Sequence, residues 1–132
     1  MERVIPLFMR RIARGEPIVV FGREKVLDFT YVDDCVAGVL AGIDALVSGK
    51  VVRQTVNLAY GQGNTLVDVV NILSLAVGRE AKATYEPSRK GEVTRYVADI
   101  NKARVLLDYE PRVPLSSGLI RAVEWSRSVG AI

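Results

Sequence analysis

Residues 15–34 read GEPIVVFGREKVLDFTYVDD, and this stretch decides the fold class. Its β-branched run Ile18–Phe21 lies between a proline and a glycine, so it predicts a short strand. After a charged turn, the segment Val26–Val32 predicts a second extended stretch. Asp33 is then expected to cap a helix that reaches Val47, because an aspartate side chain accepts hydrogen bonds from the first helical N–H groups. A strand, an extended segment and a helix in this order indicate a mixed α/β domain.

Similar elements are expected on both sides of this stretch. Upstream, apolar residues at helical spacing indicate a helix from Val4 to Arg14. Downstream, the patterns predict strands or extended pieces at 54–58, 81–86 and 96–98, and helices at 66–77, 100–107 and 115–127. No internal repeat or long linker divides the chain, so residues 1–132 are expected to form one domain.

Capping residues mark several helix ends. Asn64 or Thr65 is expected to cap the helix at 66–77, and Gly78 to end it. Asp99 is expected to cap the next helix. The helix after Asp33 carries small residues at 37, 38, 41, 42 and 45. Its two interior glycines each cost about 1 kcal/mol relative to alanine, which suggests close packing on that face.

The composition indicates one cytoplasmic domain without a membrane span. The 132 residues include 18 Lys+Arg and 15 Asp+Glu, which gives a net charge of +3. The chain has no histidine, which excludes a histidine-based triad or metal site within it. Cys35 is the single cysteine, so an intramolecular disulfide is excluded and a reducing compartment is expected. The apolar runs are shorter than the roughly 20 residues that cross a bilayer.

Three motifs are candidates for a chemical role. Gly61-Gln62-Gly63 lacks a third glycine at Leu66, so a strand-to-helix turn is favoured over a phosphate cradle. The pair Asp33-Asp34 fits a helix start better than an acid/base or metal site, because adjacent carboxylates do not face each other. A basic group with nearby tyrosines leaves two interpretations open, a solvated loop or an anion clamp. Its members are Lys82, Arg89 and Lys90.

Several segments, taken in order, resemble the carboxyl-terminal part of the NAD-dependent epimerase/dehydratase family, the extended short-chain dehydrogenases that act on nucleotide sugars. They are Gly15–Gly22, Leu27–Asp34, Asn57–Thr65, Pro87–Val93, Ala98–Asp99 with Lys102–Ala103, and Gly118–Leu119. Within the family the likeness is greatest to UDP-glucose 4-epimerase, from Asn64 through Tyr96. The resemblance implies a small α/β substrate-binding portion without the amino-terminal Rossmann half.

The resemblance also implies roles for individual residues in binding a UDP- or dTDP-sugar. Val19 and Phe21 match the strand that packs beside the nucleotide base. Leu66 matches a position at a helix start that lines the nucleotide. Asp33 resembles the family's structural helix cap.

Further matches concern the rest of the nucleotide. Arg89 matches the arginine that binds the diphosphate, Glu92 an acidic residue that accepts from the ribose hydroxyls, and Tyr96 a tyrosine near the phosphates. The sequence departs from the family at Leu27, where a second diphosphate-binding arginine is usual. Arg23 or Lys25 is a candidate to compensate.

The amino-terminal half of the family, with its glycine-rich NAD turn and Tyr-x-x-x-Lys pair, has no counterpart in this sequence. None of the five tyrosines is followed by lysine four residues later. We therefore expect no catalytic residue, no metal and no NAD bound by this chain alone, although the complete enzyme would use NAD. The leading hypothesis is the nucleotide-sugar-binding portion of an epimerase or dehydratase. The alternative is a non-catalytic module that docks with a separate Rossmann half or with itself, and no nucleic-acid partner is expected.

Overall fold

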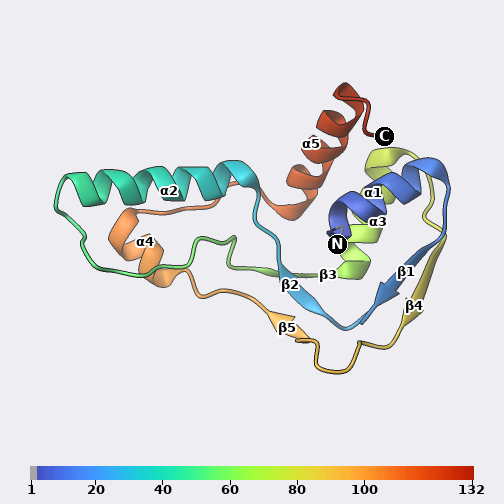
Figure 1. Cartoon of the computed structure of the whole chain (residues 1–132), viewed down its shortest axis with the longest axis horizontal. Helices are drawn as coiled ribbons and strands as arrows, with labels where there is room; N and C mark the ends of the chain where they lie inside the picture. Colours follow the sequence, from blue (N-terminus) through green and yellow to red (C-terminus); the bar gives the residue numbers. More distant parts are fainter. Residues whose placement is uncertain (1–2) are drawn as a thin grey trace.

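A computed structural model describes residues 3–132 as a mixed α/β fold (Figure 1). Its elements are α1 (Val4–Arg14), β1 (Ile18–Phe21), β2 (Val26–Asp28), α2 (Val32–Val47), β3 (Gly63–Thr65), α3 (Leu66–Val77), β4 (Ala83–Glu86), β5 (Arg95–Tyr96), α4 (Asn101–Leu107) and α5 (Leu115–Ser128). The α/β class expected from the sequence is confirmed, and most predicted helices agree with the structure within one or two residues.

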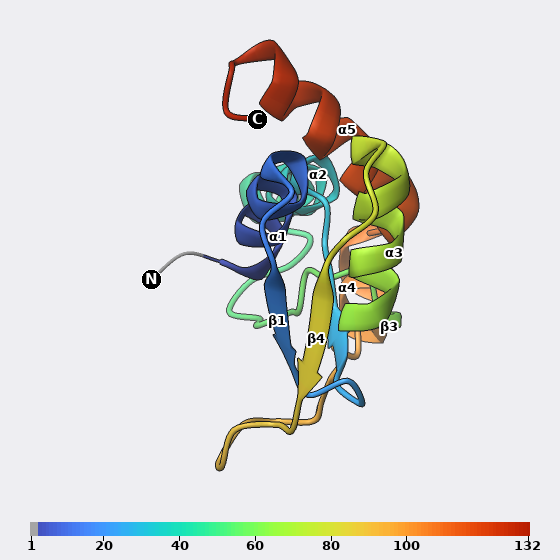
Figure 2. The ribbon, with the colours of Figure 1, turned by 90° about the vertical axis from the view of Figure 1, so that its right-hand side faces the viewer.

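The principal core lies around the strand pair β1 and β4, beside which Figure 2 shows α1 and α3. The two strands are parallel, and Ile18 pairs with Ala83 at one end while Phe21 pairs with Glu86 at the other. Successive strand residues point to opposite faces. Ile18 and Val20 are therefore buried, while Val19 and Phe21 lie on the more accessible face. The core includes Phe8, Ile12, Ile18, Val20, Leu66, Val69, Leu73, Leu119 and Val123.

A second, very short sheet connects the two ends of the molecule. β2 is antiparallel to β3 and parallel to β5. The Asp28 carboxylate accepts backbone hydrogen bonds from Tyr60 (3.2 Å), Gly61 (3.0 Å) and Ala98 (3.2 Å). Because short strands supply few ladder bonds, this carboxylate is a major link between β2 and two segments that are distant in sequence.

A smaller cluster packs α4 beside α2, on the left in Figure 1. The Asp34 carboxylate accepts from the backbone N–H groups of Arg112 (2.8 Å) and Val113 (2.9 Å).

The close packing expected at the two glycines inside α2 is confirmed at Gly38, where a Cβ would lie 2.6 Å from the Leu58 side chain. It is not seen at Gly42, where a Cβ would meet nothing within 4 Å.

The strand expected at 54–58 is wrong, because this segment has no regular secondary structure. Among residues 3–132, no strand pairs with it. Its contacts are made by side chains instead. Val56 and Leu58 pack against the smaller cluster, and the Asn57 amide donates to the Asp99 carbonyl at 3.0 Å.

Asp33 as a helix cap is also wrong. α2 begins at Val32 with Tyr31 at the N-cap position, and no side chain caps it. Asp33 lies in the first turn, where a negative charge interacts favourably with the helix dipole. By contrast, Thr65 is confirmed as the cap of α3, because its hydroxyl and the Asp68 carboxylate form a reciprocal capping box.

β3 (Gly63–Thr65) lies where the sequence predicts a turn and a helix cap, and the extended stretch expected at Val26–Val32 is a strand only over Val26–Asp28. The other differences are small shifts of boundaries. β4 begins at 83 rather than 81, and β5 covers 95–96 rather than 96–98. α4 begins after Ile100, while the Asp99 carboxylate still accepts from the Asn101 N–H at 2.9 Å. Within the described residues, no helix is both long and apolar enough to cross a membrane.

The links made by Asp28 generate a stability prediction. Asp28→Ala leaves three backbone N–H groups without their acceptor, so we expect it to lower the free energy of unfolding by about 2–3 kcal/mol, measured by urea denaturation. Asp44→Ala removes an exposed carboxylate on α2 and should change that free energy by less than about 0.5 kcal/mol. Equal effects of the two substitutions would contradict the assigned role of Asp28.

Candidate functional site

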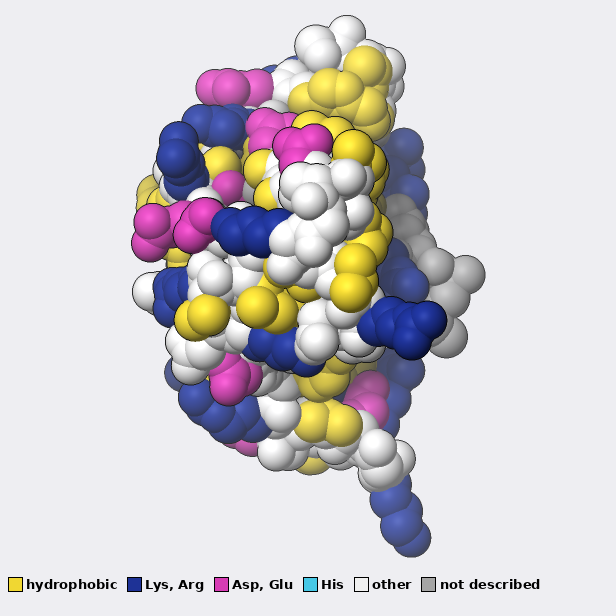
Figure 3. Space-filling model, turned by 90° about the vertical axis from the view of Figure 1, so that its left-hand side faces the viewer, with side chains coloured by type: hydrophobic (Ala, Val, Ile, Leu, Met, Phe, Trp, Pro, Cys, Tyr) yellow, Lys and Arg dark blue, Asp and Glu magenta, His cyan; other side chains and the backbone are white. Residues whose placement is uncertain are grey.

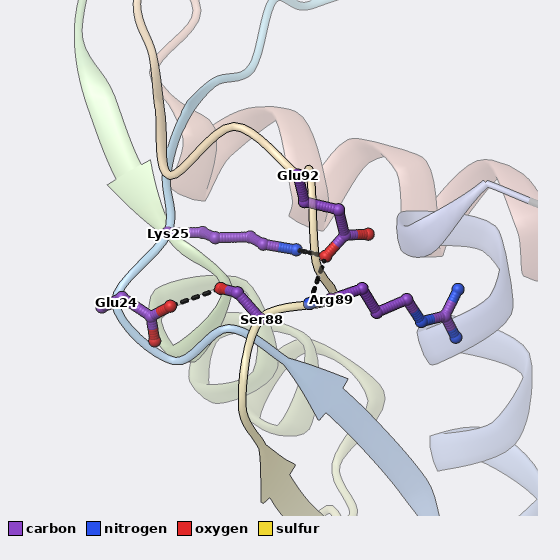
Figure 4. A network of polar contacts seen from close by, with 5 residues as sticks. All are labelled: Glu24, Lys25, Ser88, Arg89 and Glu92. Atoms are coloured by element: carbon purple, nitrogen blue, oxygen red, sulfur yellow. Dashed lines mark hydrogen bonds and ion pairs between the residues drawn. The ribbon is translucent and has the colours of Figure 1, made fainter.

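The candidate site lies where the carboxyl ends of β1 and β4 meet. Phe21 pairs with Glu86, and the Gly22 N–H donates to the Glu86 carbonyl at 2.9 Å. The two strands therefore end side by side, and the segments that follow them, 22–25 and 87–92, contact each other (Figure 4).

A buried lysine joins these two segments. Lys25 is only 7% exposed, and its ammonium forms an ion pair with Oε2 of Glu92. The Arg89 backbone N–H donates to the same oxygen at 3.0 Å. The Lys25 hydrogen bond, with a smaller contribution from the Arg89 N–H, holds the pKa of Glu92 below its ordinary value of 4.5. Glu92 is thus an oriented carboxylate that stays ionised at neutral pH.

A second contact tightens the same turn. The Ser88 hydroxyl donates to the Glu24 carboxylate, and this bond is the main reason that the pKa of Glu24 is lowered. Gly22 has a φ of +80°, and a Cβ there would lie 2.6 Å from Cε of Lys25 and still closer to the Ser88 hydroxyl. Both the backbone conformation and the lack of space therefore favour glycine at position 22, where segments 22–25 and 87–92 pass close to each other.

Arg89 lies over the ring of Phe21, with 4.1 Å between its guanidinium carbon and the ring centroid. Stacking uses the face of the guanidinium and leaves its N–H edges available. Within residues 3–132, those edges make no hydrogen bond or ion pair. Val19 lies on the same strand face as Phe21 and is exposed, whereas Phe21 is half-buried. The arrangement places a cation with free donors beside an apolar strand surface.

The structure brings only some of the expected binding residues together. Phe21, Arg89 and Glu92 converge at this site, and Val19 lies two residues along the same strand. Leu66, the first residue of α3, is instead buried in the principal core. Tyr96 lies on β5 and is 69% exposed.

The suggested basic group is not one cluster. Lys82 precedes β4 and its carbonyl accepts from the Ile18 N–H, so it lies at the opposite end of the strand pair from Arg89. Lys90 is exposed in the same loop as Arg89. Lys82 therefore cannot join Arg89 and Lys90 in one clamp, and the clamp interpretation is limited to the loop that carries those two residues.

At the position where an arginine is usual, Leu27 packs against the principal core and pairs with Tyr96 across β2 and β5. Neither residue proposed to compensate is free of other contacts. The guanidinium carbon of Arg23 lies 5.2 Å from the centroid of the Tyr85 ring, and Lys25 is paired with Glu92. Lys25 is therefore unavailable to a ligand, whereas Arg23, like Arg89, is stacked on an aromatic ring.

The glycine pair before α3 does not fit the pyrophosphate of NAD. A Cβ on Gly61 would lie 2.9 Å from the Ile100 side chain, and one on Gly63 would overlap Val26 and contact Val97 at 3.0 Å. The space that these glycines leave is thus filled by protein, which agrees with the turn interpretation. Among the described residues, no group of histidine, cysteine and acidic side chains is arranged to hold a metal ion.

Sequence reasoning missed the structural roles of Lys25, Asp28 and Asp34. Lys25 belongs to a charged turn of three residues, a pattern typical of solvated lysines. Asp28 lies within an apolar extended run, and a charged residue at such a place was the available signal that it has buried partners.

Comparison with known proteins identifies the relatives of this fold. Residues 1–59 match the NAD dependent epimerase/dehydratase family. A UDP-glucuronate 4-epimerase from Thermodesulfobacterium geofontis is 34% identical over 91% of this chain and 36% of its own length. The crystal structure of UDP-glucose 4-epimerase from Thermotoga maritima with UDP-glucose superposes with a TM-score of 0.85 at 34% identity, over 96% of this chain and 40% of that one.

A variant of the UDP-glucuronic acid 4-epimerase from Bacillus cereus, in complex with a UDP-fluoro-sugar acid and NAD, gives a TM-score of 0.86 at 26% identity. It is matched over 97% of this chain and 40% of that structure. The chain therefore spans about two fifths of the length of these relatives, and it corresponds to their carboxyl-terminal part.

The Lys25–Glu92 pair gives a prediction about titration. We expect a side-chain NMR titration of Glu92 to have its midpoint below 4.5, and Lys25→Met to raise that pKa toward 4.5. The pair contributes fully above pH 4.5 and is lost as the pH falls through the lowered pKa of Glu92. Lys90→Met, in the same loop, should leave the midpoint unchanged. A Glu92 midpoint that is insensitive to Lys25→Met would contradict the pairing.

Proposed function

Since this chain belongs to the NAD-dependent epimerase/dehydratase family, we propose that it is the portion that binds the UDP part of a UDP-sugar. The observation that carries the proposal is the Arg89 guanidinium stacked on Phe21 with its donor edges free. A guanidinium edge binds two oxygens of a phosphate at once, which suits a diphosphate. The related Thermotoga maritima and Bacillus cereus structures contain UDP-sugars or an analogue, which supports this ligand class.

The other groups at the edge complete a site for a nucleotide. The strand face that carries Val19 and Phe21 offers apolar surface for the uracil ring beside the stacked Arg89, and Glu92 offers an ionised acceptor for the ribose. Arg89 lies between them in the chain and contacts Phe21 directly. Base, ribose and diphosphate thus each have a chemically matched group within one small area.

Tyr96 and Leu66 contribute less directly in this proposal. Tyr96 lies on β5, the strand that follows the Arg89 loop in the chain, and the hydroxyl of this exposed side chain suits a phosphate or sugar oxygen. Leu66 supports the start of α3 from within the core. The sugar chemistry of the complete enzyme is assigned to the part of the family fold that this chain does not span.

Arg89→Ala tests the proposal. We expect it to weaken UDP binding about 10- to 100-fold by calorimetry, the range that corresponds to losing one strong charged hydrogen bond. Lys90→Ala removes an equal charge from the same loop and should weaken binding less than about 3-fold, because exposed charges contribute little. UDP binding that Arg89→Ala leaves intact would count against the site.

We further propose that the exposed apolar face of α2 docks the nucleotide-binding half of the family fold. This face consists of Val36, Val39, Leu40, Ile43, Leu46 and Val47, all about half exposed or more. Figure 3 looks onto the α2 and α4 end and shows apolar side chains at the surface among charged ones. Apolar surface of this extent usually marks an interaction site. About three fifths of each relative lies beyond the matched portion, which supplies an occupant of suitable size.

Charge insertion on α2 tests the docking proposal. The chain should co-elute in size-exclusion chromatography with the separately produced amino-terminal portion of the Thermotoga maritima enzyme, and Ile43→Glu should abolish the complex. Leu75→Glu, at an exposed leucine on α3, is the matched control and should leave the complex intact. Failure of the unsubstituted chain to co-elute, or co-elution despite Ile43→Glu, would contradict this use of α2.

A further inference from the structure

The two oxygens of the Glu92 carboxylate have different surroundings. Oε2 accepts from both the Lys25 ammonium and the Arg89 N–H. Oε1 has no hydrogen-bond partner within residues 3–132. In Figure 4 this second oxygen lies on the side toward which the Arg89 side chain extends. One half of the carboxylate is therefore used to hold the loop, and the other half remains available to a ligand.

Lys25 is the group that imposes this asymmetry. Its side chain is 9% exposed, whereas that of Glu92 is 37% exposed. The Lys25 stem runs past Gly22, where Cε and Cδ would lie 2.6 and 2.8 Å from an added Cβ. A lysine enclosed in this way cannot easily exchange its partner for water, because an unpaired buried charge is strongly disfavoured. Lys25 thus fixes where Oε2 lies and, through it, where Oε1 points.

Substitution of Lys25 would change the orientation and the pKa of the Glu92 carboxylate. The Arg89 N–H alone does not determine the rotation of the carboxylate, since either oxygen can accept that bond. Glu92 would then be free to turn between them, and its pKa would rise because its largest stabilising contact is gone. A ligand hydroxyl would then meet an acceptor that is no longer held in one orientation.

We infer that Lys25 is a positioning residue that presents Oε1 of Glu92 to the ribose 2′-hydroxyl and so makes the site select ribonucleotides over 2′-deoxyribonucleotides. The inference rests on the proposed UDP site. It assigns the selection to Lys25 acting through Glu92, and the diphosphate affinity separately to Arg89. The two functions are therefore separable by mutation.

The test compares UDP with 2′-deoxyuridine diphosphate by calorimetry. We expect the unsubstituted chain to bind UDP about 10-fold more tightly, as for one hydrogen bond to a charged group. Lys25→Met should reduce this ratio to about 2 or less, since an apolar isostere fills the space without orienting Glu92. Arg89→Ala should weaken both nucleotides equally and keep the ratio. Lys90→Met should change neither affinity.

A measurement without nucleotide tests whether Lys25 holds the Glu92 carboxylate in place. The Arg89 N–H should exchange with solvent at least about 10-fold faster in Lys25→Met than in the unsubstituted chain, because its acceptor is no longer held. Urea denaturation verifies that the variant is folded.

Each outcome bears on one conclusion. The role of Lys25 is overturned, while the UDP site stands, if the unsubstituted chain binds UDP and 2′-deoxyuridine diphosphate with equal affinity. The same conclusion follows if Lys25→Met leaves the ratio of the two affinities, or the exchange rate of the Arg89 N–H, unchanged. Failure of the unsubstituted chain to bind either nucleotide overturns the proposed function itself, and the selectivity inference with it.

Discussion

The parallel pairing of β1 with β4 is the constraint on which the candidate site depends. Because the strands run in the same direction and end in register at Phe21 and Glu86, the segments that follow them start side by side. Gly22 then lets these segments cross closely. The Lys25–Glu92 pair and the stacking of Arg89 on Phe21 both follow from that geometry.

Two carboxylates, the buried Asp34 and the half-buried Asp28, hold together the segments outside this strand pair. Asp28 joins β2 to the backbone at Tyr60, Gly61 and Ala98, and Asp34 joins α2 to the chain before α5. Such carboxylates replace sheet ladders where the strands are too short to provide them. The end of the molecule that carries α2 therefore has a defined position although its own hydrophobic cluster is small.

Local patterns predicted much of the fold, and long-range contacts account for what they missed. The β-branched run at β1 and the helical spacing of α1 and α3 act over a few residues, so the sequence indicates them directly. The segment 54–58 has the composition of a strand but no neighbour to pair with among the described residues. Lys25 and Glu92 are 67 residues apart, so no local pattern signals their pairing. Glu92 was identified only through a family resemblance, whereas Arg89 already belonged to the basic group that the sequence shows.

The most direct test of the account is a UDP titration of the ¹⁵N-labelled chain followed by amide NMR. The geometry at the ends of β1 and β4 predicts saturable shifts concentrated in residues 19–25 and 87–94, with α2 and α4 unaffected. Shifts confined to other parts of the molecule, or none at ligand concentrations that saturate the related enzymes, would contradict a UDP site at this edge.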